Sequence, residues 1–185
     1  MTTPTRLPPE KILSIAEEAA KAFSYTEDFN IERVVEELGG RIFLNDFWEN
    51  SAKTGSLVVG ALRNFDIFVP SHTTHERDRF TIAHELGHYI LHYLPNVDPR
   101  DDTSFQIDRY GDSLVETEAN LFASAFLMPK DQFTDMYREF KGDVTAVASK
   151  FGVSDVAARV RARMLGLHGG RKAKAVGSAA EISSA

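Results

Sequence analysis

The chain has 185 residues, of which 43% are hydrophobic and 26% are charged, which is enough for one sizeable core. It has no cysteine, so any bound metal must be held by His, Asp or Glu. Its formal net charge of -6 argues against a nucleic-acid backbone as the main partner. Because no apolar run approaches the roughly 18 residues of a membrane helix and no basic segment precedes an apolar one at the start, we expect a cytoplasmic protein.

The first part of the chain predicts two helices and then a sheet. Apolar residues at spacings of three and four indicate an amphipathic helix over residues 8–24. A second, shorter helix is capped by Asn30 and ends at Gly39-Gly40. A small antiparallel sheet ending in a hairpin is predicted from three segments rich in Val, Ile, Leu and Phe, residues 41–45, 55–62 and 65–70.

The second part of the chain is mainly helical. Helical spacing returns over residues 76–93, until Pro95 ends the run. Residues 95–112 mix Pro, Asp, Asn and Gly without periodicity and predict a long irregular loop. Further helices are expected over residues 113–126, 130–140 and 144–165, the last interval forming two helices joined at Phe151-Gly152-Val153, with Ser154 as the second cap.

The helix predicted over residues 76–93 carries the segment His84-Glu85-Leu86-Gly87-His88. Two histidines four residues apart lie on one helix face, so both imidazoles can reach a single tetrahedral cation. Glu85 would sit beside that cation without binding it, where it can accept a proton from an attacking water. Gly87 is expected to leave room beside the metal. The alternative is that the two histidines lie on the surface of an unrelated helix.

A catalytic zinc has three protein ligands and one open position, so one ligand must come from elsewhere. His92 lies two turns from His84, too far along the axis at a rise of about 1.5 Å per residue, so we interpret it as supporting a ligand or ending the helix. Glu116 and Glu118 are better candidates. Glu116 has an alternative role, because Ser113 and Glu116 form a capping box. The residues alone leave both carboxylates open.

Two blocks of the sequence resemble the ImmA/IrrE family of metallopeptidases. The first runs from Arg79 to His88 with Leu91-His92 following, and the second runs from Glu116 to Ala123 and leads to Leu127-Met128-Pro129. The likeness extends roughly over residues 30–167. In that family the Glu that opens the second block is the third zinc ligand, which here is Glu116. The resemblance implies an α+β fold: a mainly helical zincin-like domain with a small antiparallel sheet, whose zinc helix and Glu helix face each other.

The resemblance also implies a function. It suggests a zinc-dependent endopeptidase, gluzincin-like, in which Zn²⁺ is held by His84, His88 and Glu116 and Glu85 is the general base. Members of the family typically cut helix-turn-helix repressors of the Xre type and thereby derepress mobile-element, phage or stress-response genes. We therefore expect a protein substrate that adds as a strand to the edge of the hairpin. The residue that assists the oxyanion is left open among Tyr89, Tyr93, His75 and Tyr110.

We expect a peptidase domain over residues 8–140, a helix-turn-helix-like pair over 141–168 packed on it, and a disordered tail over 169–185. Arg159, Arg161 and Arg163 make the second helix of the pair basic, which suggests DNA binding. We favour packing or substrate docking, because the apolar residues of the pair, including Val156 and Val160, would cover the core. The alternatives are a non-proteolytic regulator that binds DNA or a repressor through this pair, and a zinc hydrolase of a small non-peptide substrate.

Overall fold

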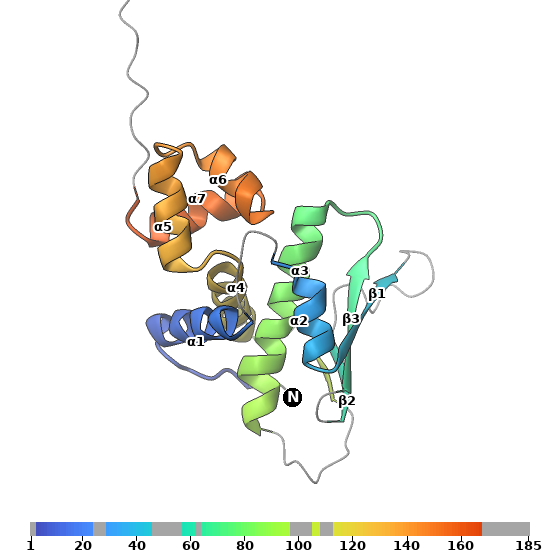
Figure 1. The fold of residues 1–185 in the computed structure, drawn as a ribbon. Helices are drawn as coiled ribbons and strands as arrows, with labels where there is room; N and C mark the ends of the chain where they lie inside the picture. The colour runs from blue at the N-terminus through green and yellow to red at the C-terminus, as the bar shows by residue number, and fades with distance from the viewer. Residues whose placement is uncertain are drawn as a thin grey trace, which may run out of the picture.

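The computed structural model describes residues 3–23, 29–45, 57–61, 64–96, 105–107 and 113–167. A small sheet lies on one side, helices α2 and α3 pack on it, α4 packs on α3, α1 packs on α4, and α5 to α7 group at one end (Figure 1). This arrangement confirms the predicted α+β fold class. Within the described residues, no helix is both long and apolar enough to cross a membrane.

The first two helices form where the sequence predicted them. Helix α1 (Pro9–Ala22) buries Ile12, Ala16 and Ala20, whose spacing of four places them on one face, and this helix packs against α4. Helix α2 (Ile31–Glu37) begins at Asn30, whose side-chain oxygen accepts the backbone N–H of Arg33 at 2.8 Å. The buried residues of both helices belong to the hydrophobic core.

The sheet differs from the prediction in the direction of one strand. Its strand order is β1-β3-β2-β4, formed by β1 (Gly40–Asn45), β2 (Leu57–Ala61), β3 (Asn64–Pro70) and β4 (Phe105–Ile107). The predicted hairpin is confirmed, because β2 and β3 pair antiparallel. The prediction of a fully antiparallel sheet is wrong, because β1 pairs parallel to β3 and the sheet is mixed. After β1, the chain enters the sheet again as β2, on the other side of β3, and β2 runs opposite to β1. The hairpin then reverses the chain, so that β3 runs parallel to β1.

Two further expectations about the sheet are corrected. Residues 105–107, inside the segment predicted to be an irregular loop, form β4 and pair with β2. A strand of three residues is too short to show an alternating pattern in the sequence. Neither hairpin strand is an edge of the described sheet, since β2 lies between β3 and β4 and β3 lies between β1 and β2. The expected edge strand for a substrate is therefore not in the hairpin.

The helix that carries the histidines changes its winding at the second histidine. Helix α3 (His75–Gly87) begins at Thr74, whose hydroxyl accepts the N–H of Arg77, and it continues into a π-helix, η1 (His88–Tyr93), and a short 3-10 turn, η2 (Leu94–Asn96). The Leu94 N–H bonds the Tyr89 carbonyl, five residues back. The sequence predicted one continuous helix here, because a π turn leaves no signature in apolar spacing.

Helix α4 (Ser113–Leu127) packs directly against α3. A Cβ added to Gly87 would lie 3.2 Å from the Cα and carbonyl oxygen of Ala119. The room at Gly87 is thus occupied by the α4 backbone, rather than left beside a metal as we expected. The absence of a side chain lets the two helices approach closely, and this approach sets the distance between the histidines and the first turn of α4.

The last helices form as predicted, but one apolar face is not buried. They are α5 (Lys130–Glu139), α6 (Val144–Phe151) and α7 (Asp155–Met164), with Gly152 in a left-handed turn at φ 59° between the last two. Val156 and Val160 are 70% and 44% exposed, so the expectation that they cover the core is wrong. The tail and Tyr110 lie outside the described residues, and the division of the chain at residues 140 and 168 stays a prediction.

Candidate metal centre

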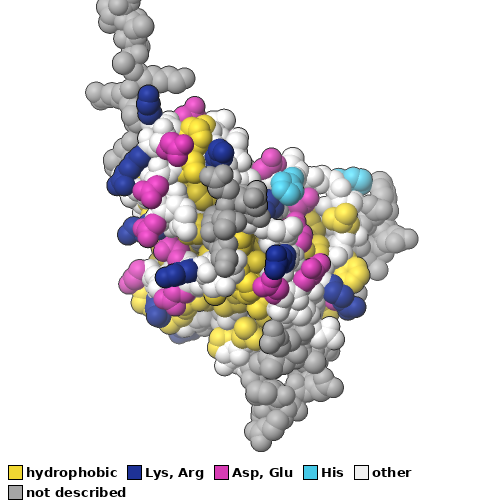
Figure 2. Space-filling model, in the orientation of Figure 1, with side chains coloured by type: hydrophobic (Ala, Val, Ile, Leu, Met, Phe, Trp, Pro, Cys, Tyr) yellow, Lys and Arg dark blue, Asp and Glu magenta, His cyan; other side chains and the backbone are white. Residues whose placement is uncertain are grey.

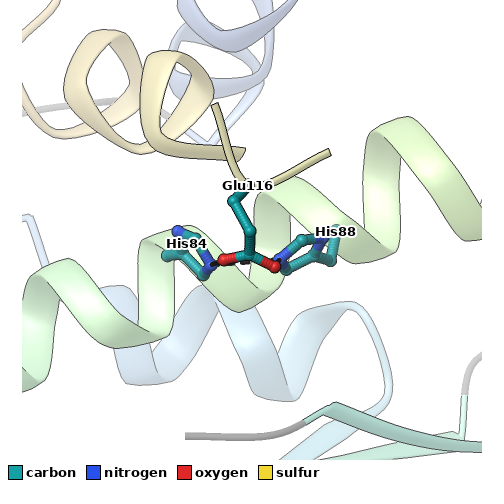
Figure 3. Close-up of side chains that lie close together, drawn as sticks. All are labelled: His84, His88 and Glu116. Atoms are coloured by element: carbon teal, nitrogen blue, oxygen red, sulfur yellow. Dashed lines mark hydrogen bonds and ion pairs between the residues drawn. The ribbon is translucent and has the colours of Figure 1, made fainter. Parts of the chain in front are cut away.

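The two histidines and Glu116 meet between α3 and α4. His84 lies in the last turn of α3, His88 opens η1, and Glu116 lies in the first turn of α4. Both imidazole rings point toward the Glu116 carboxylate (Figure 3). The two Nε2 atoms are 3.0 Å apart, and Glu116 oxygens lie 3.2 Å from Nε2 of His84 and 3.5 Å from Nε2 of His88. One ligand atom from each residue lies within 4.8 Å of the others.

Asn120 determines which nitrogen of His84 faces this cluster. The Nδ1 atom of His84 lies 3.0 Å from Oδ1 of Asn120, one turn after Glu116 on α4. An amide oxygen can only accept, so Nδ1 is the donor and carries the ring proton. The Nε2 atom of His84 therefore presents a lone pair to His88 and Glu116. Sequence reasoning did not find Asn120, although its position four residues after Glu116 places it on the same helix face.

His88 is uncharged at neutral pH. Burial, together with the nearby His84, lowers the pKa of His88 to about 3, and the Glu116 carboxylate opposes this shift only in part. His88 as a whole residue is 1% exposed. A neutral imidazole is the form that binds a metal, so at neutral pH no proton has to be displaced from His88 first.

This set of ligand atoms fits a divalent cation. Two neutral imidazole nitrogens and a carboxylate repel one another unless a proton or a cation lies among them, and two His with one Glu is a ligand set of catalytic zinc. The side chains of His84 and Glu116 are 15% and 26% exposed, whereas that of His88 is 2% exposed. The site is therefore open on one side, as a catalytic metal requires.

Glu85 and Glu118 occupy different positions from Glu116. Glu85 follows His84 on α3 and is 3% exposed. Of the two carboxylates considered for the third ligand, the structure brings Glu116 to both histidines and turns Glu118 toward His92, whose Nε2 lies 2.8 Å from Oε2 of Glu118. Residues two apart on a helix point in different directions, so only one of the pair can face the cluster. The Ser113 side chain lies outside the described residues, so the capping box of Ser113 and Glu116 stays a prediction.

The electrostatics of Glu118 reflect its contacts. Burial raises the pKa of Glu118, but hydrogen bonds from His92 and from the backbone N–H groups of Thr5 and Arg6 outweigh this effect, and the pKa lies below its ordinary value.

Two of the tyrosines considered for the oxyanion are instead part of the core. Tyr89 is 1% exposed and stacks on Phe65, and Tyr93 stacks on Tyr89.

An apolar groove adjoins the cluster. It has a volume of about 660 Å³ and lies between α3, α4 and α7. Thr117, next to Glu116, and Asn120, the partner of His84, line one part of it. The exposed apolar side chains of α7 line another part, and these are Val156, Val160 and Met164. The groove thus connects the residues around the cluster to the apolar face of the last helix.

The chain is similar in sequence to known peptidases. The family model described as the IrrE N-terminal-like domain, a peptidase family, matches residues 35–163. The chain is 34% identical over 94 residues to the radiation response metalloprotease IrrE of Deinococcus deserti, covering 50% of this chain and 32% of that protein. The likeness to the protein of the same name from Deinococcus radiodurans is again 34% over 94 residues, and covers 28% of that protein. The chain therefore matches about a third of the length of these relatives.

Proposed function

This chain belongs to the IrrE N-terminal-like domain family of peptidases, and from that premise we propose that it is a zinc-dependent endopeptidase. Zn²⁺ would be held by His84, His88 and Glu116. The observation that carries the proposal is the convergence of these three side chains, with one ligand atom from each within 4.8 Å of the others. Catalytic zinc sites use this number of protein ligands and keep a fourth position open.

The residues around the metal position have separable roles in peptide hydrolysis. When bound, zinc supplies Lewis acidity, which polarises a carbonyl group and lowers the pKa of water. Glu85 acts as the general base: its carboxylate accepts a proton from the attacking water and then gives it to the leaving amine. Asn120 holds His84 by the hydrogen bond to Nδ1, so that the other ring nitrogen keeps its direction.

The groove beside the site favours a protein substrate. Its apolar lining suits a hydrophobic side chain or the apolar face of a helix, and its position next to Thr117 and Asn120 would hold such a group close to the scissile bond. We infer that the substrate is a helix-turn-helix repressor of the Xre type, as the family resemblance suggests. Its cleavage would derepress mobile-element, phage or stress-response genes.

The alternative function is a non-proteolytic regulator that binds DNA or a repressor through α6 and α7. Of the three arginines that suggested a basic surface, Arg161 is 0% exposed and donates to the Met128 carbonyl and to Glu17. It is therefore not available to phosphate groups. On the face shown in Figure 2, positive and negative side chains are interspersed rather than separated. These observations favour the peptidase.

A cleavage experiment separates the two functions. The purified zinc-loaded protein would be incubated with a purified Xre-type repressor, and the products identified by mass spectrometry. We expect the wild type to cut the repressor at a defined bond, and Glu85→Gln to bind zinc normally but to lose at least about 100-fold of the cleavage rate, the scale of a general base. Gene induction by Glu85→Gln without cleavage would support the non-proteolytic regulator instead.

A further inference from the structure

A continuous chain of hydrogen bonds runs from His88 to the N-terminal segment. The Nδ1 atom of His88 lies 3.1 Å from Nδ1 of His92, and Nε2 of His92 lies 2.8 Å from Oε2 of Glu118. The Glu118 carboxylate accepts the backbone N–H groups of Thr5 and Arg6, both at 2.8 Å. These contacts start at the edge of the His88 ring opposite to the nitrogen that faces His84 and Glu116.

The positions of the protons follow from the ends of this chain. A backbone N–H can only donate, and one such group points at each oxygen of Glu118, which favours the ionised carboxylate as an acceptor. The Nε2 atom of His92 must then donate to Glu118. In a neutral His92 ring the other nitrogen accepts, so Nδ1 of His88 is the donor. This leaves the lone pair of His88 on Nε2, the nitrogen that faces the metal position.

We propose that His92, Glu118 and the backbone of Thr5 and Arg6 form a positioning relay, which holds His88 in the Nδ1–H tautomer with Nε2 directed at the metal. The proposal rests on the metal site of the proposed function and not on peptide cleavage. Partners of this kind orient metal-binding histidines and raise their basicity. His92, Glu118, Thr5 and Arg6 lie outside the group of three residues that would hold the metal.

The surroundings of the relay strengthen its hydrogen bonds. The side chains of His92 and Glu118 are 0% and 2% exposed, so water does not compete for the contact between them. The relay lies partly in η1, where the Leu94 N–H bonds the Tyr89 carbonyl. The π turn begins at His88 and contains both histidines, and such turns occur often at functional sites.

The N-terminal segment has a conformation that suits this role. The backbone of Arg6 has a positive φ of 55°, a conformation that residues other than glycine rarely adopt. Successive backbone N–H groups at such a residue turn toward a common point and form a cradle for an anion. Here the anion is the Glu118 carboxylate. The relay therefore ties residues 5–6, which precede α1, to the geometry of the metal centre.

The zinc affinity of the full-length protein tests the relay without any substrate. It is measured by competition with a chromophoric zinc chelator. We expect Glu118→Gln and His92→Phe to weaken zinc binding by about 10- to 100-fold, the usual effect of losing such a partner. In Glu118→Gln, the new side-chain amide would have one oxygen and one N–H₂ group. In either orientation of the amide, the N–H₂ group would face an N–H donor of the backbone or of the His92 ring. Glu10→Gln, in the first turn of α1, is the matched control and should bind zinc as the wild type does.

A second pair of variants avoids the buried positions. Arg6→Pro removes one backbone N–H and the positive φ, whereas Arg6→Gly keeps both and loses only the exposed side chain. We expect Arg6→Pro to weaken zinc binding up to about 10-fold, and Arg6→Gly to stay near the wild-type value. This contrast is measurable even if Glu118→Gln does not fold.

Nitrogen-15 NMR of the histidine rings gives the direct readout. In the zinc-loaded wild type we expect the proton of His88 on Nδ1 and that of His92 on Nε2. A His88 ring with its proton elsewhere, or unchanged zinc affinity in Glu118→Gln and Arg6→Pro, would overturn the relay while leaving the metal site intact. A wild-type protein that binds no zinc would overturn both the relay and the proposed function.

Discussion

Gly87 of α3 lies in direct contact with the backbone of Ala119 in α4, and this contact determines how closely Glu116 approaches the histidines. Replacement of Gly87 by Ala improves helix propensity by about 1 kcal/mol, but it forces the α4 backbone outward, and overpacking typically costs about 1–3 kcal/mol. We expect Gly87→Ala to lower the free energy of unfolding and to weaken zinc binding, measured by urea denaturation and chelator competition.

Gly60→Ala is the matched control for this prediction. A Cβ at Gly60 would meet its nearest atom at 3.7 Å, an ordinary contact. We expect this variant to keep the zinc affinity of the wild type. If Gly87→Ala also bound zinc as tightly as the wild type, the close approach of the two helices would not matter for the site.

The apolar groove leads to a prediction about substrate binding. Val160 lines it from α7 and is 44% exposed, so its replacement should affect the substrate more than the fold. We expect Val160→Asp to raise KM for repressor cleavage about tenfold, which corresponds to about 1.4 kcal/mol, with little change in kcat. Ser149→Asp on α6 introduces the same charge outside the groove and should leave KM unchanged. Equal KM values for the two variants would argue against the groove as a docking site.

The low pKa of His88 predicts how the stability of the metal-free protein depends on pH. The groups that face its ring are His84, His92 and Glu116. In the unfolded chain a histidine has a pKa of about 6.5, whereas the folded pKa of His88 is about 3. At a pH above the pKa of the unfolded chain, His88 is unprotonated in both the folded and the unfolded state. At a pH between the two pKa values, only the unfolded state binds the proton. The free energy of unfolding therefore falls as the pH is lowered through this window, by about 1.4 kcal/mol per pH unit for one group.

The measurement is urea denaturation of the metal-free wild type and of His88→Gln at several pH values. Other carboxylates and histidines contribute to both curves, so the difference between them isolates His88. We expect the wild type to lose stability more steeply than the variant as the pH falls from about 6.5 toward 3. Parallel curves would mean that His88 titrates normally in the folded protein.

The buried Arg161 links α7 to α1 through Glu17, at 2.6 Å. Because burial lowers the pKa of Arg161 but leaves its guanidinium charged, removal of the carboxylate would strand an uncompensated cation in the core. We expect Glu17→Gln to reduce the free energy of unfolding by on the order of 3 kcal/mol, measured by urea denaturation.

The exposed pair of Arg33 and Glu37 provides the comparison for Glu17→Gln. Their side chains are 77% and 48% exposed, so Glu37→Gln should change stability by less than about 1 kcal/mol. Equal losses in the two variants would indicate that the Arg161 pair contributes no more than a surface ion pair.

The residues of the site differ in how far the sequence could predict them. His84 and His88 could be paired from spacing alone, because four residues on a helix bring two side chains to one face. The third ligand could not, because the approach of α4 depends on a contact at Gly87 that is remote in sequence. The choice of Glu116 over Glu118 came from the family resemblance, and the positions of the two carboxylates in the structure agree with it.

The errors in the predicted fold have the same physical origin. The parallel pairing of β1 with β3 and the short β4 are set by contacts between distant segments, which local apolar spacing does not encode. The apolar stripe of α7 has the spacing of a buried face, yet Val156 is exposed beside the groove. Helix geometry predicted that His92 supports a ligand or ends the helix and does not bind the metal. Its contact with His88, however, depends on a π turn that the sequence does not reveal.

Anomalous X-ray diffraction at the zinc absorption edge, from crystals of the zinc-loaded protein, tests the central claim most directly. We expect one strong peak within bonding distance, about 2.0–2.2 Å, of Nε2 of His84, Nε2 of His88 and a carboxylate oxygen of Glu116. No peak at this position, or a peak bound by His92 and Glu118 instead, would contradict the assignment of the metal centre.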